Sequence, residues 1–173
     1  HYPDGREYPL DQFYNRMKEG AVAVTAAANV AELSDGMEAH LRQGKDVLFL
    51  CFSSGLSSTR DACAIAAGEL QEKYPDRKIY TVDTLAASGG QGLLVLLAGR
   101  KRLTGATIEE VRDFAEQIKL HIGHWFTVDS LTYLKRGGRV SPAAAAVGTM
   151  LNIKPVLHVD NEGHLIPVEK VRG

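Results

Sequence analysis

The clearest pattern in the chain is a short apolar run followed by a polar turn. Residues 47–52 are all apolar, and a run of this length is typical of a strand buried on both faces. Residues 53–59 carry hydroxyls and one glycine, and the apolar residues after them recur at helical spacing as far as Tyr74. The order strand, turn, helix places the hydroxyls at the carboxyl end of a strand, where open α/β sheets bind ligands.

Strands and helices are predicted to alternate over most of the chain. Strands are expected near residues 21–25, 46–52 and 77–83, and helices near residues 10–19, 29–41, 62–74, 92–100 and 108–122. Capping-box spacing supports three helix starts, at Asn29 with Glu32, Ser88 with Gln91 and Thr107 with Glu110. This alternation predicts an α/β fold, a parallel sheet with flanking helices.

The pattern changes after residue 122. The expected elements are a strand at 125–128, a short helix ending at Lys135, a buried helix at 143–151 and a hairpin of strands 153–159 and 165–171. We interpret this part as the start of a second α+β subdomain. The boundary is placed near residues 121–124, which gives a ligand-binding subdomain at 1–122 and part of a second one at 123–173.

Composition and charge exclude several classes of function. The chain has 173 residues, of which 45% are hydrophobic and 24% charged, as in globular proteins. Its net charge of −1 gives no attraction to nucleic acid, and no apolar run approaches the roughly 20 residues of a membrane span. The two cysteines, Cys51 and Cys63, fall at predicted buried positions and fit a reducing, cytoplasmic location. No signal peptide is apparent, and a turn at residues 2–5 suggests that earlier sequence precedes this chain.

The hydroxyl-rich turn at 53–59 permits three interpretations. Hydroxyls and the free N–H groups of a helix start suit a carboxylate or phosphate, but the serines can also serve only as helix caps. Gly55-Leu56-Ser57 also resembles the nucleophile elbow of serine hydrolases, although Thr59 replaces the second glycine. A hydrolase would use Ser57 as its nucleophile.

Other candidate motifs are weaker. The six histidines show no ligand spacing, so no metal site is predicted. The segment Gly89-Gly90-Gln91-Gly92 lacks the known phosphate-loop patterns, which favours close helix–strand packing. Lys135, Arg136 and Arg139 form a basic turn that is either a solvated face or a docking patch.

Four blocks of the sequence, in order, resemble the DegV family, a bacterial fatty-acid-binding fold. The blocks are Ser53-Ser54-Gly55-Leu56-Ser57 with Thr59; Val82-Asp83 with 88–94; Phe126-Thr127-Val128 with Leu131, 133–135 and Gly137-Gly138-Arg139; and 151–155 with the closing 170–173. The resemblance covers almost the whole chain. It implies that the family's opening strand would precede His1 and that its C-terminal α/β part would follow Gly173.

The resemblance also implies a site and a partner. Family members hold a fatty-acid carboxylate in an apolar tunnel between two subdomains, through a threonine and a serine that map onto Thr25 and Ser57, with Ser54 and Gly55 in the same turn. After Thr25 the chain reads Ala-Ala-Ala-Asn and departs from the family's Thr-Ser-Gln-Pro turn. Some members serve phospholipid metabolism by presenting the fatty acid to a fatty acid kinase, and Arg172 falls in the region implied to contact it. A solvated edge strand would also explain Arg172.

A non-enzymatic carrier of long-chain fatty acids is therefore the favoured function. It needs no cofactor, no nucleic acid and no stable membrane insertion. Each buried CH₂ of an acyl tail contributes about 0.8 kcal/mol, so a long tail outweighs an imperfect headgroup pocket. The alternatives are a hydrolase that uses Ser57 and a purely structural or regulatory module.

Overall fold

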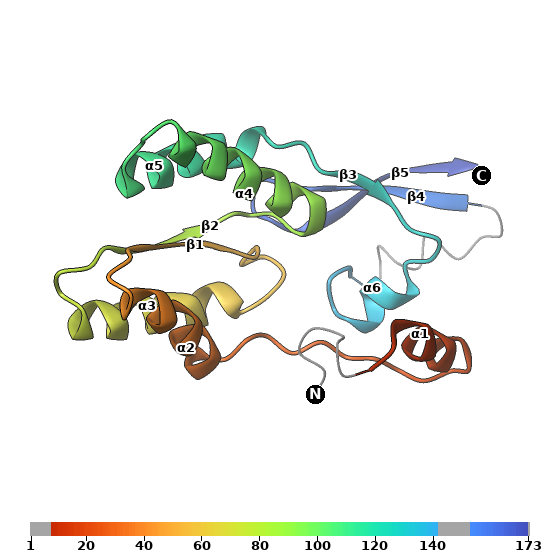
Figure 1. Cartoon of the computed structure of the whole chain (residues 1–173). Helices are drawn as coiled ribbons and strands as arrows, with labels where there is room; N and C mark the ends of the chain where they lie inside the picture. The colour runs from red at the N-terminus through yellow and green to blue at the C-terminus, as the bar shows by residue number, and fades with distance from the viewer. Residues whose placement is uncertain (1–7, 142–152, 173) are drawn as a thin grey trace.

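Two β-sheets organise the part of the chain that the structure describes, which is residues 8–141 and 153–172 of a computed structural model (Figure 1). β1 (Val47–Cys51) and β2 (Ile79–Asp83) pair in parallel. β3 (Trp125–Thr127), β4 (Ile153–Val159) and β5 (Leu165–Arg172) form an antiparallel sheet in that order. The mixed α/β class and the hairpin predicted from the sequence are confirmed.

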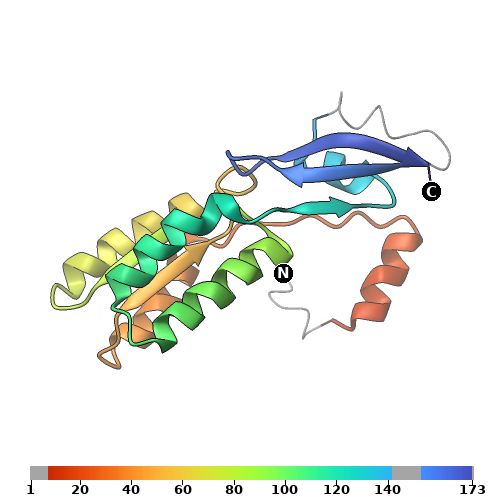
Figure 2. The ribbon, with the colours of Figure 1, turned by 90° about the horizontal axis from the view of Figure 1, so that it is seen from above.

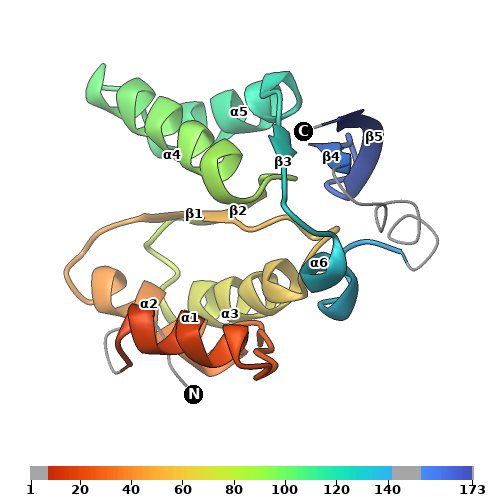
Figure 3. The same ribbon diagram turned by 90° about the vertical axis from the view of Figure 1, so that its right-hand side faces the viewer.

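Helices cover both faces of the parallel sheet, as Figure 3 shows. α2 (Val30–Leu41) and α3 (Thr59–Lys73) lie on one side, and α4 (Ser88–Leu103) and α5 (Ile108–Ile118) lie on the other. Side chains alternate along β1 accordingly. Val47 and Phe49 pack into the core that α2 and α3 share, whereas Leu48 and Leu50 pack into the core beneath α4 and α5. This arrangement explains why the strand is apolar at every position.

The second sheet has its own small core. α6 (Thr132–Arg136) lies beside it, and Leu131, Val140 and Leu157 are its buried residues. Figure 2 shows the β4–β5 hairpin extending away from the helices of the first sheet, and α1 (Leu10–Lys18) lying apart from them. A short 3₁₀ helix, η1 (Lys119–His121), follows α5. The division into subdomains 1–122 and 123–173 stays a prediction.

Two of the three predicted capping boxes are formed, and the third prediction is wrong. Asn29 with Glu32 and Thr107 with Glu110 make both reciprocal hydrogen bonds. α4 instead begins at Ser88 itself, after Ala87, with no side-chain cap. The amide of Gln91 donates to the carbonyl of Leu50 at 3.1 Å, so this side chain ties α4 to β1 instead of closing a box.

The strand predicted at residues 21–25 is not formed. The segment is free of regular structure, and Val22 and Val24 are 66% and 89% exposed. A strand needs a neighbour to satisfy its backbone groups, and β1 and β2 are the only strands of the parallel sheet within the described residues. The alternating Ala-Val pattern indicated an extended chain but carried no information about a partner.

The helix predicted at 92–100 is only partly buried. Leu94 and Ala98 face the core, whereas Leu93 and Leu96 are 45% and 50% exposed. The helix predicted at 143–151 lies outside the described residues, as does Gly173. None of the helices in the described ranges is long and apolar enough to cross a membrane.

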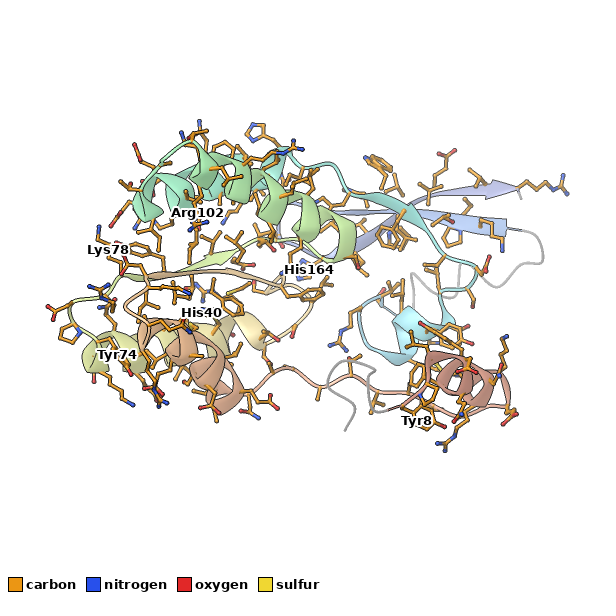
Figure 4. The ribbon with its side chains drawn as sticks, viewed as in Figure 1. Tyr8, His40, Tyr74, Lys78, Arg102 and His164 are labelled. Atoms are coloured by element: carbon orange, nitrogen blue, oxygen red, sulfur yellow. The ribbon has the colours of Figure 1, made fainter. Side chains whose placement is uncertain are left out.

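One buried charge joins α2 to α3. Glu38 on α2 accepts hydrogen bonds from the hydroxyl of Tyr74 at 2.7 Å and from Arg42 at 2.8 Å, and it pairs with Lys73 at 2.6 Å. Its hydrogen bonds with Lys73 and then Tyr74 lower the pKa of Glu38 to about 2. Tyr74 lies at the end of the molecule away from the hairpin (Figure 4).

Candidate ligand-binding site

A cavity of about 870 Å³ lies where the two sheets approach each other. Its walls come from the segment before α2, the turn after β1, the start of α4, the chain through β3, the region around α6 and the hairpin. Most lining side chains are apolar, among them Phe52, Leu56, Phe126 and Leu165. The volume falls within the range of roughly 300–1,000 Å³ typical of sites that enclose a small organic ligand.

Thr25 and Ser57 both line this cavity. They come from distant segments, one from the irregular stretch before α2 and the other from the turn between β1 and α3. The structure therefore brings together the two residues that the sequence proposed as headgroup ligands. Whether they bind a headgroup stays a prediction.

The turn after β1 holds Ser57 in a defined position. The carbonyl of Ser53 accepts hydrogen bonds from the backbone N–H groups of Leu56 and Ser57, each at 3.1 Å. The Ser57 hydroxyl oxygen lies 2.8 Å from that of Thr59 and accepts the Thr59 N–H at 3.2 Å. The N-cap residue of α3 is Ser58, whose side chain makes no capping bond. Ser57 thus stabilises the first residue of α3 while its hydroxyl remains at the cavity wall.

Ser54 and Gly55 lie outside the cavity lining. The side chain of Ser54 is exposed, and its backbone N–H donates to the carboxylate of Asp83 at 3.2 Å. A Cβ on Gly55 would come within 2.8 Å of the backbone of Glu162 and Gly163. These two residues shape the turn, and neither of them is part of the cavity wall.

Arg139 is a site residue that the sequence analysis did not assign to the cavity. It is the one permanently charged side chain among the described lining residues. Its Nε–H donates to the carbonyl of Leu56 at 3.1 Å, which holds the guanidinium against the turn that carries Ser57. Another N–H of the guanidinium donates to the carbonyl of Gly137. The sequence marked Arg139 only as part of a basic turn and of the Gly-Gly-Arg block.

His124 lies on the wall of the same cavity, directly against the first turn of α4. A Cβ on Gly90 would come within 2.2 Å of the imidazole ring, so the ring packs on the bare α-carbon of the glycine. Burial lowers the pKa of His124, because it disfavours the charged form of the ring. The glycine-rich segment at 89–92 therefore makes room for a side chain of the cavity wall.

The geometry around Ser57 does not favour the hydrolase interpretation. A serine nucleophile needs a histidine within hydrogen-bond reach as its general base. Ser57 is instead paired with Thr59. In the described part of the chain, the ring of His124 packs against Gly90, and His164 lies in the hairpin turn. The hydroxyl of Ser57 is hydrogen-bonded to Thr59 and to neither of these histidines.

One group of side chains has the spacing of a metal site. Asp160, Glu162 and His164 place ligand atoms within 4.8 Å of one another, the only such group among the residues described. Asp160 already accepts the backbone N–H groups of Glu162 and His164 at 2.9 and 2.8 Å, so its carboxylate has a structural role in the turn.

Arg172 lies at the opposite end of the hairpin from the cavity. It is exposed at the end of β5, as is Lys170, whereas Leu165 at the start of β5 lines the cavity. The structure therefore separates the proposed docking residue from the proposed headgroup residues by the length of a strand.

A family model described as "Uncharacterised protein, DegV family" matches residues 1–173. The chain belongs to the DegV family. A DegV domain-containing protein of Clostridium perfringens is 45% identical over 161 residues, which cover 93% of this chain and 55% of that protein. The chain spans a little over half the length of the DegV relatives it matches.

Solved DegV structures share the fold of this chain. A DegV lipid-binding protein of Thermotoga maritima superposes with a TM-score of 0.82 at 34% identity, over 99% of this chain and 57% of that one. The fatty acid kinase B3 protein of Streptococcus pneumoniae, solved with linoleic acid, superposes with a TM-score of 0.85 at 25% identity, over 95% of this chain and 58% of that one. Neither relative is described as a hydrolase, so the comparisons give that alternative no support.

Proposed function

We propose that this DegV chain binds a long-chain fatty acid, with the carboxylate at Thr25 and Ser57 and the acyl tail in the apolar cavity. The observation that supports the proposal is that Thr25 and Ser57, which come from distant segments, both line one mostly apolar cavity of about 870 Å³. The lipid-binding and linoleate-bound relatives support it, since they share the fold over nearly the whole chain.

The polar groups of the cavity match the needs of a carboxylate. A carboxylate taken out of water without hydrogen bonds costs several kcal/mol. Two hydroxyl donors, Thr25 and Ser57, reduce that cost, and the guanidinium of Arg139 beside the turn supplies the opposite charge. The rest of the wall is mostly apolar, and Arg139 is the only lining residue with a permanent charge within the described residues.

The tail supplies most of the affinity. At about 0.8 kcal/mol per buried CH₂, a dozen methylenes contribute roughly 10 kcal/mol before the costs of association. A short carboxylic acid therefore binds weakly at the same headgroup site, and long-chain acids are the preferred class of ligand.

The chain acts as a carrier whose bound carboxylate is phosphorylated by a partner fatty acid kinase. Thr25 and Ser57 supply binding groups, and the kinase supplies the phosphate donor and the catalytic residues. Arg172 docks the partner, because arginine keeps its charge and pairs bidentately with carboxylates. A cytoplasmic location agrees with the two free, buried cysteines Cys51 and Cys63.

Mass spectrometry of the purified protein under denaturing conditions tests the binding function directly. We expect close to one fatty acid per chain in the organic extract of the wild type, and a much lower occupancy when Thr25→Val and Ser57→Ala are combined. The proposal would be contradicted by a wild-type protein that carries no fatty acid and that does not bind a fluorescent fatty acid at micromolar concentrations.

A further inference from the structure

The tip of the β4–β5 hairpin contacts the turn that carries Ser57. The hydroxyl of Ser53 is fully buried and donates to the carbonyl of Gly163 at 2.8 Å, across 110 residues of sequence. The same oxygen accepts the backbone N–H of Gly55 at 3.2 Å. Figure 2 shows the hairpin tip reaching back over the loop that follows β1, and Figure 4 places His164, next to Gly163, at the middle of the molecule.

Two glycines allow this close approach. A Cβ on Gly163 would lie 2.0 Å from the Ser53 hydroxyl oxygen, and a Cβ on Gly55 would lie 2.8 Å from the backbone of the hairpin. Gly163 also has a φ of +82°, which disfavours any larger residue. The backbone of the hairpin tip therefore fits tightly against the Ser53 side chain and the backbone of Gly55.

Ser53 transmits this contact to Ser57. Its carbonyl accepts the N–H groups of Leu56 and Ser57, so a shift of Ser53 moves Ser57 with it. The turn is also tied to the loop between β2 and α4, because the N–H of Ser53 donates to the carbonyl of Ala86 at 3.0 Å. Neither Ser53 nor Gly163 lines the cavity, so neither can touch the ligand directly.

We propose that the hairpin tip is a positioning element for the carboxylate site, in which Gly163 sets Ser53 and Ser53 sets the hydroxyl of Ser57. The inference rests on the proposed fatty-acid function. It assigns to the second sheet a role in recognising the headgroup, in addition to forming part of the cavity wall. The acyl tail contacts other parts of the wall, so displacement of the turn should weaken recognition of the acid group selectively.

The test compares oleic acid with oleyl alcohol, which has the same tail and no charge. Each ligand competes with a neutral fluorescent probe for the purified protein. Ser53→Ala should lower the affinity for oleic acid about tenfold, because the displaced Ser57 hydroxyl loses a hydrogen bond to the charged carboxylate, and it should change the affinity for the alcohol less than twofold. Gly163→Ala should lower the affinity for the acid at least as much, because its methyl group displaces Ser53.

Matched controls separate positioning from general damage. Like Ser53, Ser130 donates its hydroxyl proton to an oxygen and accepts the N–H of the residue two positions later. It lies before α6 and not in the turn that carries Ser57, so Ser130→Ala should leave the ratio of the affinities for oleic acid and oleyl alcohol unchanged. Gly105 has a φ of +88° with no atom near its Cβ position, so Gly105→Ala introduces the backbone strain of Gly163→Ala without the clash.

The outcomes are distinct. The positioning role would be overturned if folded Ser53→Ala protein binds both ligands as the wild type does, or if it loses the same factor of affinity for oleic acid and for oleyl alcohol. Either result would leave the proposed fatty-acid site intact. A wild type that does not prefer the acid would refute the carboxylate site itself, and this inference with it. Gly163→Ala protein that fails to fold leaves the decision to Ser53→Ala, which adds no atoms.

Discussion

The hydroxyl oxygens of Ser57 and Thr59 lie 2.8 Å apart, and the N–H of Thr59 donates to the Ser57 oxygen as well, at 3.2 Å. A hydroxyl oxygen has two lone pairs and one proton. When Thr59 also donates its hydroxyl proton, both lone pairs of Ser57 are occupied and its own proton is left for an acceptor in the cavity. In that arrangement the pair prepares Ser57 to act as a donor, which is what a bound carboxylate requires.

Ser57→Ala should therefore weaken fatty-acid binding by roughly 5- to 150-fold, because a partly buried carboxylate loses a hydrogen bond worth about 1–3 kcal/mol. Displacement of a fluorescent fatty acid measures the change. Ser58→Ala is the matched control, since the neighbouring side chain is exposed and makes no capping bond. Equal affinities of the two variants would remove Ser57 from the site, and labelling of Ser57 by a fluorophosphonate would favour the hydrolase instead.

Thr25 and Ser57 should be energetically coupled if they hold one carboxylate. The double variant Thr25→Val with Ser57→Ala should then lose less affinity than the two single variants added together, by about 0.5–3 kcal/mol. A double-mutant cycle with oleic acid measures this difference. Strict additivity would mean that the two hydroxyls contact different groups.

The candidate site was predictable from the sequence only in part. The turn after β1 could be recognised because an apolar run, hydroxyls and a helix follow one another directly. That Thr25 shares a cavity with Ser57 came from the family resemblance. Arg139 was missed because its proximity to Leu56 depends on how the second sheet packs against the first, which no local pattern encodes.

The fold shows the same limit. The β4–β5 hairpin and the capping box at Asn29 were predicted correctly because their signals lie within a few residues. The strand expected at 21–25 failed because pairing depends on a distant partner. Gln91 has capping-box spacing, yet it bonds to Leu50 on β1, since tertiary contact outweighed the local alternative.

Arg172→Ala should leave fatty-acid binding unchanged and slow acyl-phosphate formation by the partner kinase about fivefold, the effect of losing one favourable ion pair. Arg172 is exposed at the far end of β5 from the cavity. Arg102, exposed at the end of α4 that lies opposite the hairpin in Figure 4, provides the control variant Arg102→Ala. Unaffected phosphorylation would show that Arg172 does not dock the kinase, and a parallel loss of binding would indicate damage to the fold.

Acid should weaken the contact between α2 and α3 through Glu38. Its pKa is about 2 in the folded chain, against 4.5 for an unperturbed glutamate, so the unfolded chain binds the proton first as pH falls. The stabilisation by Glu38 is complete above about pH 5 and is lost between 4.5 and 2. Urea unfolding should show Glu38→Gln less stable than the wild type at pH 7, with a difference that shrinks toward pH 2.5. A difference independent of pH would contradict the ion-pair account.

Gly90→Ala should narrow the cavity without unfolding the protein. The added methyl would lie 2.2 Å from the ring of His124, so the ring must move from its place in the wall. Overpacking of this kind costs roughly 1–3 kcal/mol, and oleic acid should bind at least about fivefold more weakly.

Gly99 is in the same helix with open space at its Cβ position, so Gly99→Ala should stabilise the fold by about 0.5–1 kcal/mol and leave binding unchanged. Urea unfolding and ligand displacement on both variants separate the two effects. Unchanged affinity in folded Gly90→Ala protein would mean that the ligand does not use the part of the cavity that His124 lines.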